Sequence, residues 1–129
     1  METNVHKWHV LIVDDNLELA ETLKHLLEEH QFEATVVSNG VLGLKHALHK
    51  PVDAVISDLQ MPQLEGDVFY SAVERLNPTL AKRFVFITGM ADDPHFQKFV
   101  TSVRAPLLRK PVAIDQLVAA LKQVLAQPV

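Results

Sequence analysis

The sequence contains no cysteine, and this absence excludes several kinds of chemistry at once. A chain without thiols cannot form a disulfide, a thiolate-ligated zinc site or a cysteine nucleophile. Any catalytic or metal-binding site must therefore use other side chains. A chain without cysteine is also compatible with the reducing cytoplasm, and we expect a cytoplasmic protein.

Long hydrophobic runs and clusters of positive charge are missing as well. The N-terminal segment METNVHKWHV lacks the apolar core of a signal peptide. No apolar stretch approaches the roughly 20 residues that cross a membrane as a helix. The 12 basic residues are scattered among 16 acidic ones, which leaves a net charge of -4. Because nucleic-acid-binding surfaces usually cluster their basic residues, we expect neither a membrane protein nor direct nucleic-acid binding.

The remaining composition is that of an ordinary globular domain. The chain has 129 residues, of which 48% are hydrophobic and 22% are charged. These values suit one domain with one hydrophobic core. No internal repeat, low-complexity segment or linker interrupts the chain. We expect a single domain over residues 1–129, with its core over about 8–126.

Short apolar runs rich in valine and isoleucine alternate with segments of helical periodicity. The strands are predicted at 9–13, 33–37, 53–57, 83–88 and 105–109. The helices are predicted at 16–30, 39–49, 65–76, 94–103 and 113–126, with Asn39 placed to cap the second of them.

This strict alternation of strands and helices predicts the fold class. It indicates parallel strands joined by right-handed crossovers, with helices on both faces of the sheet. The strands are nearly all apolar, as expected when both faces are covered. We therefore expect an α/β three-layer sandwich of the flavodoxin-like (βα)5 type, with a parallel five-stranded sheet in the order 2-1-3-4-5.

Polar side chains follow the predicted strands at their carboxyl ends. Asp14 and Asp15 follow the first strand, Asp58 the third, and Lys110 the fifth, while Thr88 ends the fourth. Ligands of open parallel sheets bind beyond these strand ends. Since the first and third strands are neighbours in the expected order, three carboxylates should converge there, with a hydroxyl and an ammonium beside them.

Converging carboxylates need positive charge near them. Two of them repel each other by roughly 4 kcal/mol at about 4 Å if the effective dielectric constant is near 20. Lys110 supplies one positive charge, and Mg²⁺ is the expected second because it prefers hard oxygen ligands. Magnesium beside a hydroxyl and an ammonium is an arrangement that handles phosphoryl groups. A carboxylate can be the nucleophile there, by forming an aspartyl phosphate.

Four segments of the chain, VLIVDDN, DAVISDLQMPQLEG, VFITG and LLRKP, together resemble the CheY-like receiver domain of two-component response regulators. The resemblance extends over about residues 10–126. It implies that Asp58 is the phosphoacceptor and that Mg²⁺ is the cofactor. It also implies that Asp15 ligates the metal directly, that Asp14 acts largely through water, and that the backbone carbonyl of Gln60 completes the protein ligands.

The same resemblance assigns roles to two further side chains. Thr88 is similar to the switch hydroxyl of the family, and Lys110 to the lysine that pairs with the phosphoryl group. The Lys110–Pro111 bond is a candidate cis peptide bond.

Three positions depart from common features of the family or bear on the lifetime of the phosphate. Leu107 stands where the family often has a tyrosine or phenylalanine that swings inward when the switch hydroxyl engages the phosphate. Coupling between that hydroxyl, Thr88, and an aromatic ring cannot operate here, so we treat Thr88 and Leu107 as the switch positions to test. Gln60 and Met90 occupy positions that influence phosphate hydrolysis in the family. An apolar Met90 cannot orient an attacking water.

The resemblance also implies partners. The phosphodonor would be a histidine kinase or a histidine phosphotransfer protein, and the output would be contact with another protein. The surface expected to change lies near 94–103, 105–109 and 113–126. The resemblance does not decide whether the domain forms a homodimer. The domain would catalyse its own aspartyl phosphorylation and dephosphorylation without being an enzyme that acts on a separate substrate.

Other interpretations of these residues were weighed. Asp14 and Asp15 could be simple helix caps. A degenerate receiver could act as an interaction module without phosphorylation, an alternative that Leu107 keeps open. An aspartate-nucleophile phosphatase of the haloacid dehalogenase type is less favoured, because its Asp-x-Asp motif is replaced here by adjacent aspartates.

Two further groups of residues have ordinary structural interpretations. His46 and His49 are spaced like metal ligands on one helix face, but no third ligand is apparent, so we expect solvated side chains. Phe96, Phe99 and Val100 are expected to face the core.

Overall fold

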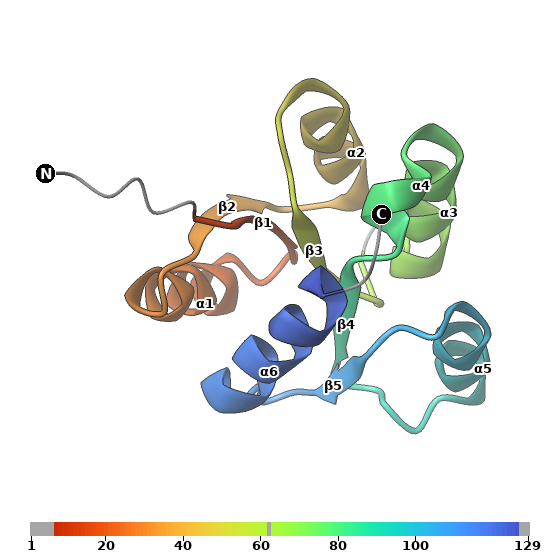
Figure 1. The fold of residues 1–129 in the computed structure, drawn as a ribbon. Helices are drawn as coiled ribbons and strands as arrows, with labels where there is room; N and C mark the ends of the chain where they lie inside the picture. Colours follow the sequence, from red (N-terminus) through yellow and green to blue (C-terminus); the bar gives the residue numbers. More distant parts are fainter. Residues whose placement is uncertain (1–6, 62, 127–129) are drawn as a thin grey trace, which may run out of the picture.

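The computed structural model describes residues 7–61 and 63–126 of the chain, arranged as a central sheet between two layers of helices (Figure 1). The strands are β1 His9–Val13, β2 Glu33–Val37, β3 Ala54–Asp58, β4 Phe84–Thr88 and β5 Leu107–Arg109. The helices are α1 Leu17–Glu29, α2 Gly40–His49, α3 Gly66–Leu76, α4 Pro78–Ala81, α5 Pro94–Val103 and α6 Ile114–Leu125. No helix in these described ranges is long and apolar enough to cross a membrane.

The strand order is β2-β1-β3-β4-β5, and every neighbouring pair is parallel. This confirms the predicted flavodoxin-like sheet. β1 and β3 lie side by side, with Val13 opposite Ser57. The residues that follow these two strands therefore emerge next to each other at one edge of the sheet.

Alternating side chains of the strands point to opposite faces of the sheet and build two cores. Val10 and Ile12 pack with the buried faces of α1 and α6. Leu11 and Val13 pack on the other face, together with α3 and α5 and with partly buried residues of α2. Figure 1 shows α1 and α6 on one side of the sheet and α2, α3, α4 and α5 on the other. Covering both faces explains why β1, β3 and β4 are almost entirely apolar.

An aromatic cluster fills the second core between α3, β4 and α5. Tyr70 meets Phe84 edge-on, with ring centroids 5.1 Å apart, and Phe86 meets Phe99 at 5.3 Å in a similar geometry. Leu107 of β5 is partly buried against the same core. Edge-to-face contacts of this kind add about 0.5–1.5 kcal/mol per pair beyond the burial of area.

The structure differs clearly from the predicted elements at two places. The short helix α4 was not expected; it forms because Pro78 suits the first turn of a helix and the Asn77 side chain accepts a hydrogen bond from the backbone N–H of Leu80 at 3.1 Å. β5 begins at Leu107 rather than at residue 105. Pro106 lacks the N–H that a strand pairing would use, although its carbonyl accepts from Phe86 N.

The helix caps agree with the sequence. The Asn39 side chain accepts a hydrogen bond from Leu42 N at 2.8 Å, so the predicted cap of α2 is confirmed. Asn16 caps α1 in the same way through Leu19 N at 3.1 Å. Asparagine at these positions satisfies backbone donors that the first helical turn leaves free. The cap of α1 is therefore Asn16, and the aspartates that precede it are available for another task.

Candidate functional site

Three carboxylates meet at the carboxyl ends of β1 and β3, as the strand order predicts. Each of Asp14, Asp15 and Asp58 offers an oxygen that lies within 4.8 Å of the oxygens of the other two. Asp14 is fully buried and Asp58 is 4% exposed, while Asp15 is exposed to solvent. The group is thus open on one side and closed on the other.

Local turns orient the two buried carboxylates. Asp14 Oδ1 accepts a hydrogen bond from Asn16 N at 2.9 Å, and Asp58 Oδ1 accepts one from Gln60 N at 3.0 Å. Both contacts join a side chain to the backbone two residues later, a turn typical of aspartate. The second oxygen of each carboxylate is left to face the other charges of the site.

Lys110 reaches those second oxygens from the end of β5. Its Nζ donates a hydrogen bond to Asp58 Oδ2 at 2.8 Å and lies 3.2 Å from Asp14 Oδ2. The Lys110 backbone N–H donates to the Thr88 carbonyl at 2.9 Å, which ties the start of this loop to β4. The Lys110–Pro111 bond is cis, as predicted.

Burial and neighbouring charges shift two ionisable groups of this site. Burial raises the pKa of Asp14, and the Asp58 carboxylate raises it further, against the lowering effects of the Asn16 N–H and of Lys110. Burial by itself would lower the pKa of Lys110. The hydrogen bond to Asp58 and the charges of Asp58 and Asp14 outweigh it, so the pKa of Lys110 is raised. The site therefore favours the charged form of Lys110 and disfavours the charged form of Asp14.

A pocket of about 490 Å³ opens above these charges; the described residues that line it are Asp15, Asp58, Gln60, Met61, Gly89 and Lys110. Asp14 Oδ2 is buried and accepts no hydrogen bond within the described part of the chain, although it lies in ion-pair range of Lys110. A buried carboxylate oxygen with free acceptor capacity, beside two further carboxylates, is a donor set that fits Mg²⁺. The residues present are thus consistent with the metal site implied by the sequence.

The structure does not place every predicted residue in this pocket. Thr88 is fully buried, and its hydroxyl accepts a hydrogen bond from Met90 N at 3.0 Å. Among the described residues that line the pocket, Thr88 does not appear. Leu107 is partly buried against the aromatic core described above and is not among the described residues that line the pocket. The acidic residues, Gln60 and Lys110 are brought together, whereas the two expected switch positions are not part of that group.

The other residues singled out in the sequence have structural roles. Phe96 and Val100 are buried and Phe99 is partly buried, as expected. His46 is half-buried rather than solvated: its ring stacks on that of His9, with centroids 6.4 Å apart and planes 17° apart. Burial lowers the pKa of His46, and the charges of His9 and Lys50 add to this effect.

The sequence did not predict one further group of side chains. Glu65, Asp67 and His95 offer ligand atoms that lie within 4.8 Å of one another. Glu65 and Asp67 belong to the start of α3, whereas His95 belongs to the start of α5, 28 residues beyond Asp67. No spacing within a single helix or strand signals such a group, because the packing of α3, α4, β4 and the loops between them decides whether the starts of α3 and α5 meet.

Comparisons with known proteins agree with this fold and this site. Residues 10–122 match the response regulator receiver domain family. A probable chemotaxis protein CheY of Rhizobium etli is 33% identical over 120 residues, which are 92% of each chain. The transcription factor SKN7 of Candida albicans is 26% identical over 95% of this chain, and the sensor kinase CckA of Brucella abortus is 25% identical over 90%.

The length of these relatives varies. The chain spans 92% of the Rhizobium protein but only 22% of the Candida protein and 12% of the Brucella kinase. Among solved structures, a CheY-like receiver domain protein of Methanospirillum hungatei aligns with a TM-score of 0.84 at 23% identity, over 93% of this chain and 94% of that one. The chemotaxis protein CheY4 of Vibrio cholerae aligns with a TM-score of 0.80 at 25% identity, over 92% and 99%. The strand order, the acidic group at the ends of β1 and β3 and the match over residues 10–122 lead to one conclusion: the chain belongs to the response regulator receiver domain family.

Proposed function

We propose that Asp58 accepts a phosphoryl group from a phosphohistidine of a histidine kinase or a histidine phosphotransfer protein, and that the phosphorylated domain signals through contact with another protein in the cytoplasm. The observation that carries this proposal is the position of Asp58 at the end of β3. Asp58 is 4% exposed, its carboxylate faces an open pocket, and Lys110 Nζ contacts it at 2.8 Å. Receiver domains work with histidine kinases in two-component signalling, and one relative of this chain is a sensor kinase.

The proposed transfer exchanges one bond for another. The nitrogen–phosphorus bond of the phosphohistidine breaks while a bond forms between phosphorus and an Asp58 oxygen, and the released imidazole takes up a proton from solvent. Burial reduces competing solvation of the Asp58 carboxylate on the side that faces the core. Gln60 N holds Oδ1, so the orientation of the carboxylate is set before the donor arrives.

Positive charge is needed where the phosphoryl oxygens arrive. Lys110 Nζ contacts Asp58 Oδ2 and would turn from it to a phosphoryl oxygen once the carboxylate is esterified. We assign Mg²⁺ to Asp14, Asp15, Asp58 and the Gln60 carbonyl, and when bound it supplies neutralisation of phosphoryl charge. The raised pKa of Asp14 reflects the burial and carboxylate repulsion that a cation would relieve.

Thr88 and Leu107 are proposed as the switch. The Thr88 hydroxyl accepts from Met90 N at 3.0 Å and keeps its own O–H, which it would donate to a phosphoryl oxygen. Rotation of the hydroxyl toward the phosphoryl group would shift the contact with Met90 N, and with it the loop from Gly89 to Asp93, which connects β4 to α5. Leu107 packs under this region with the aromatic core and would transmit the movement by repacking rather than by rotation of a ring. The surface expected to report phosphorylation is formed by α5, β5 and α6, through an output protein or a second copy of the domain.

The deciding experiment is phosphorylation of the purified domain by a small phosphodonor, followed by intact-mass measurement. One added phosphate is expected with magnesium, and none in the Asp58→Asn variant or without the metal. Asp53→Asn is the matched control, because Asp53 precedes the same strand and accepts a hydrogen bond from His9 N at its opposite end. The control should be phosphorylated like the unmodified domain. A persistent adduct in Asp58→Asn would place the acceptor elsewhere.

One alternative has structural support of its own. Leu107 replaces the usual aromatic side chain and is partly buried against the second core, so the alternative is a domain that binds partners in one fixed conformation. Such an interaction module would give no adduct under any condition and would bind its partner equally well with Asp58→Asn. The mass experiment and a binding measurement with that variant separate the two functions.

A further inference from the structure

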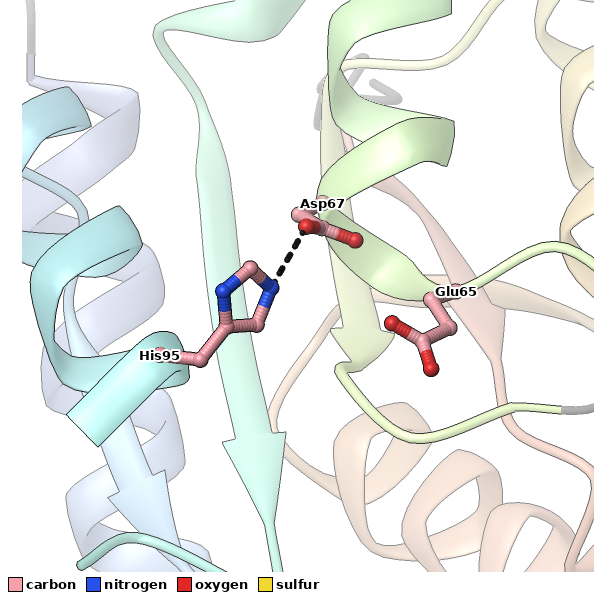
Figure 2. A group of neighbouring side chains, drawn as sticks. All are labelled: Glu65, Asp67 and His95. Carbon is pink, nitrogen blue, oxygen red and sulfur yellow. Dashed lines mark hydrogen bonds and ion pairs between the residues drawn. The ribbon is translucent and has the colours of Figure 1, made fainter. Parts of the chain in front are cut away.

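We propose that Glu65, Asp67 and His95 form a second metal site, which takes Zn²⁺ and joins the start of α3 to the start of α5. The proposal does not rest on phosphorylation of Asp58. Figure 2 shows the His95 ring pointing at the Asp67 carboxylate, with the Glu65 side chain in the same region. The group is separate from Asp14, Asp15 and Asp58, which form an all-oxygen set together with a lysine.

The spacing of the ligand atoms suits one tetrahedral ion. His95 Nε2 lies 3.0 Å from Asp67 Oδ2, and all three ligand atoms lie within 4.8 Å of one another. Two ligands held at about 2.0–2.1 Å from zinc in tetrahedral geometry are separated by roughly 3.3 Å. The His95–Asp67 contact therefore needs to open only slightly, and rotation of the exposed Glu65 side chain can supply the third ligand.

The remaining contacts of these residues leave the ligand atoms available. Asp67 Oδ1 accepts a hydrogen bond from Val68 N at 2.9 Å, which orients the carboxylate with Oδ2 toward His95. Glu65 stands at the N-cap position of α3, yet its side chain caps no backbone N–H of that helix. Its carboxylate therefore does not accept the hydrogen bond that an N-cap side chain usually accepts from the first helical turn.

Neighbouring acidic residues are already occupied. Asp93 Oδ1 accepts from His95 N at 2.8 Å and caps α5, while Asp92 pairs with Arg109 at 3.0 Å. The Asp93 contact holds the His95 backbone in place, and Glu65 and Asp67 are the acidic residues grouped with His95 in the described part of the chain. The cation would sit near two helix N-termini, whose partial positive charge opposes it, so both carboxylates are needed to offset that effect.

The ligand chemistry selects zinc over magnesium. Imidazole nitrogen combined with carboxylate oxygen suits Zn²⁺, whereas Mg²⁺ prefers oxygen and retains its waters. Zinc would occupy the place of the proton that Nε2 shares with Asp67, and the neutral ring would carry its proton on Nδ1. Three protein ligands leave a fourth position for water. The bound ion would hold together the loops that follow β3 and β4, both of which border the Asp58 pocket.

The test is a zinc titration of the purified domain by calorimetry, in excess Mg²⁺ and on an Asp15→Asn background that weakens the all-oxygen group. One equivalent of zinc is expected to bind. His95→Gln should weaken binding at least tenfold, since glutamine can replace the hydrogen bond to Asp67 but not the imidazole ligand. Glu65→Gln should weaken it as well. Because His95 is 64% exposed, the variant should melt like its parent.

His25→Gln is the matched control. His25 lies 3.7 Å from Glu28 and is 76% exposed, and this imidazole–carboxylate pair belongs to none of the three-ligand groups found in the described residues. The control should bind zinc like its parent. Cobalt substitution adds a readout, because Co²⁺ in a tetrahedral site absorbs visible light, and that band should vanish with His95→Gln. Zinc affinity unchanged in His95→Gln, or reduced equally by His25→Gln, overturns the proposal.

Discussion

The Lys110 ammonium lies 2.8 Å from Asp58 Oδ2 and joins the end of β5 to the end of β3 across the intervening strand β4. The same nitrogen lies 3.2 Å from Asp14 Oδ2, on β1's side of the site. One side chain therefore neutralises two buried carboxylates that come from different strands. This arrangement is the basis of the first prediction.

Replacing Lys110 by methionine should destabilise the metal-free protein, because two buried carboxylates lose their only strong ammonium contact among the described residues. Losing one partner of a fully buried ion pair costs about 3–5 kcal/mol. Since the Lys110 side chain is 22% exposed, we expect about 2 kcal/mol. Urea unfolding with and without Mg²⁺ measures this loss, and magnesium should recover part of it.

Arg109→Met is the control for this experiment. Arg109 precedes Lys110 but pairs with Asp92 at the surface, with the two side chains 60% and 83% exposed. Solvent screens such pairs, so the Arg109 variant should unfold at nearly the same urea concentration as the unmodified protein. An Arg109 variant as unstable as the Lys110 variant would contradict the assigned importance of the buried contacts.

Magnesium should stabilise the domain by binding among Asp14, Asp15 and Asp58. A ligand that binds only the folded state adds about 2.7 kcal/mol at a hundredfold excess over its Kd. Asp15→Asn should raise the melting temperature without metal, since it removes one repelling charge, and should reduce the increase that magnesium causes. Thermal unfolding over a magnesium series measures both effects. Equal magnesium responses of Asp15→Asn and the unmodified protein would remove Asp15 from the ligands.

Gly66→Ala should disturb the backbone that carries Asp58 and Leu59. A Cβ at Gly66 would lie 2.5 Å from the Asp58 carbonyl oxygen and 2.8 Å from Leu59 Cα, so backbone atoms would have to move. Overpacking of this kind costs about 1–3 kcal/mol. Gly89→Ala is the matched comparison, because a Cβ there meets nothing within 4 Å, and it should change stability by less than about 0.5 kcal/mol. Equal losses in the two variants, measured by urea unfolding, would refute the close packing at Gly66.

Tyr70 should ionise only at a pH above its ordinary range. Burial raises the pKa of its phenol above 10.0, and the charge of Glu74 and the hydrogen bond to Oε2 at 3.4 Å raise it further. The stability that the neutral phenol contributes is thus complete below pH 10.0 and is lost as the pH rises through the folded-state value.

The chain contains one tyrosine, so ultraviolet titration of its phenolate reports Tyr70 alone. The midpoint should lie above 10.0 in the folded protein and return toward that value in urea. Glu74→Gln should lower the folded-state midpoint while leaving it raised by burial. A folded-state midpoint that matches the value in urea would show that the ring is solvated.

The sequence predicted the positions of most site residues, because these residues directly follow the ends of the strands. The alternation of apolar runs and helical segments predicted parallel strands, and the order 2-1-3-4-5 placed Asp58 next to Asp14 and Asp15. Lys110 could be added because it follows the last strand. Rules of this kind hold since the direction and spacing of parallel strands leave little freedom to the first residues after them.

Details that depend on individual side chains could not be predicted in this way. The Thr88 hydroxyl accepts a hydrogen bond from Met90 N, a contact within one turn that the pattern of strands and helices does not predict. The helix α4 and the late start of β5 depend on Asn77, Pro78 and Pro106, whose effects extend over only a few residues.

The sequence by itself thus determined the fold class, the strand order and the carboxylate group of this receiver domain, because hydrophobic periodicity and strand ends are local in the chain. Only the tertiary structure decided how Lys110 divides its contacts between Asp58 and Asp14. It alone also decided that His95 meets Asp67 across 28 residues. The physical reason is that such contacts depend on how whole helices and loops pack, and no periodicity along the chain records the distance between two helix ends.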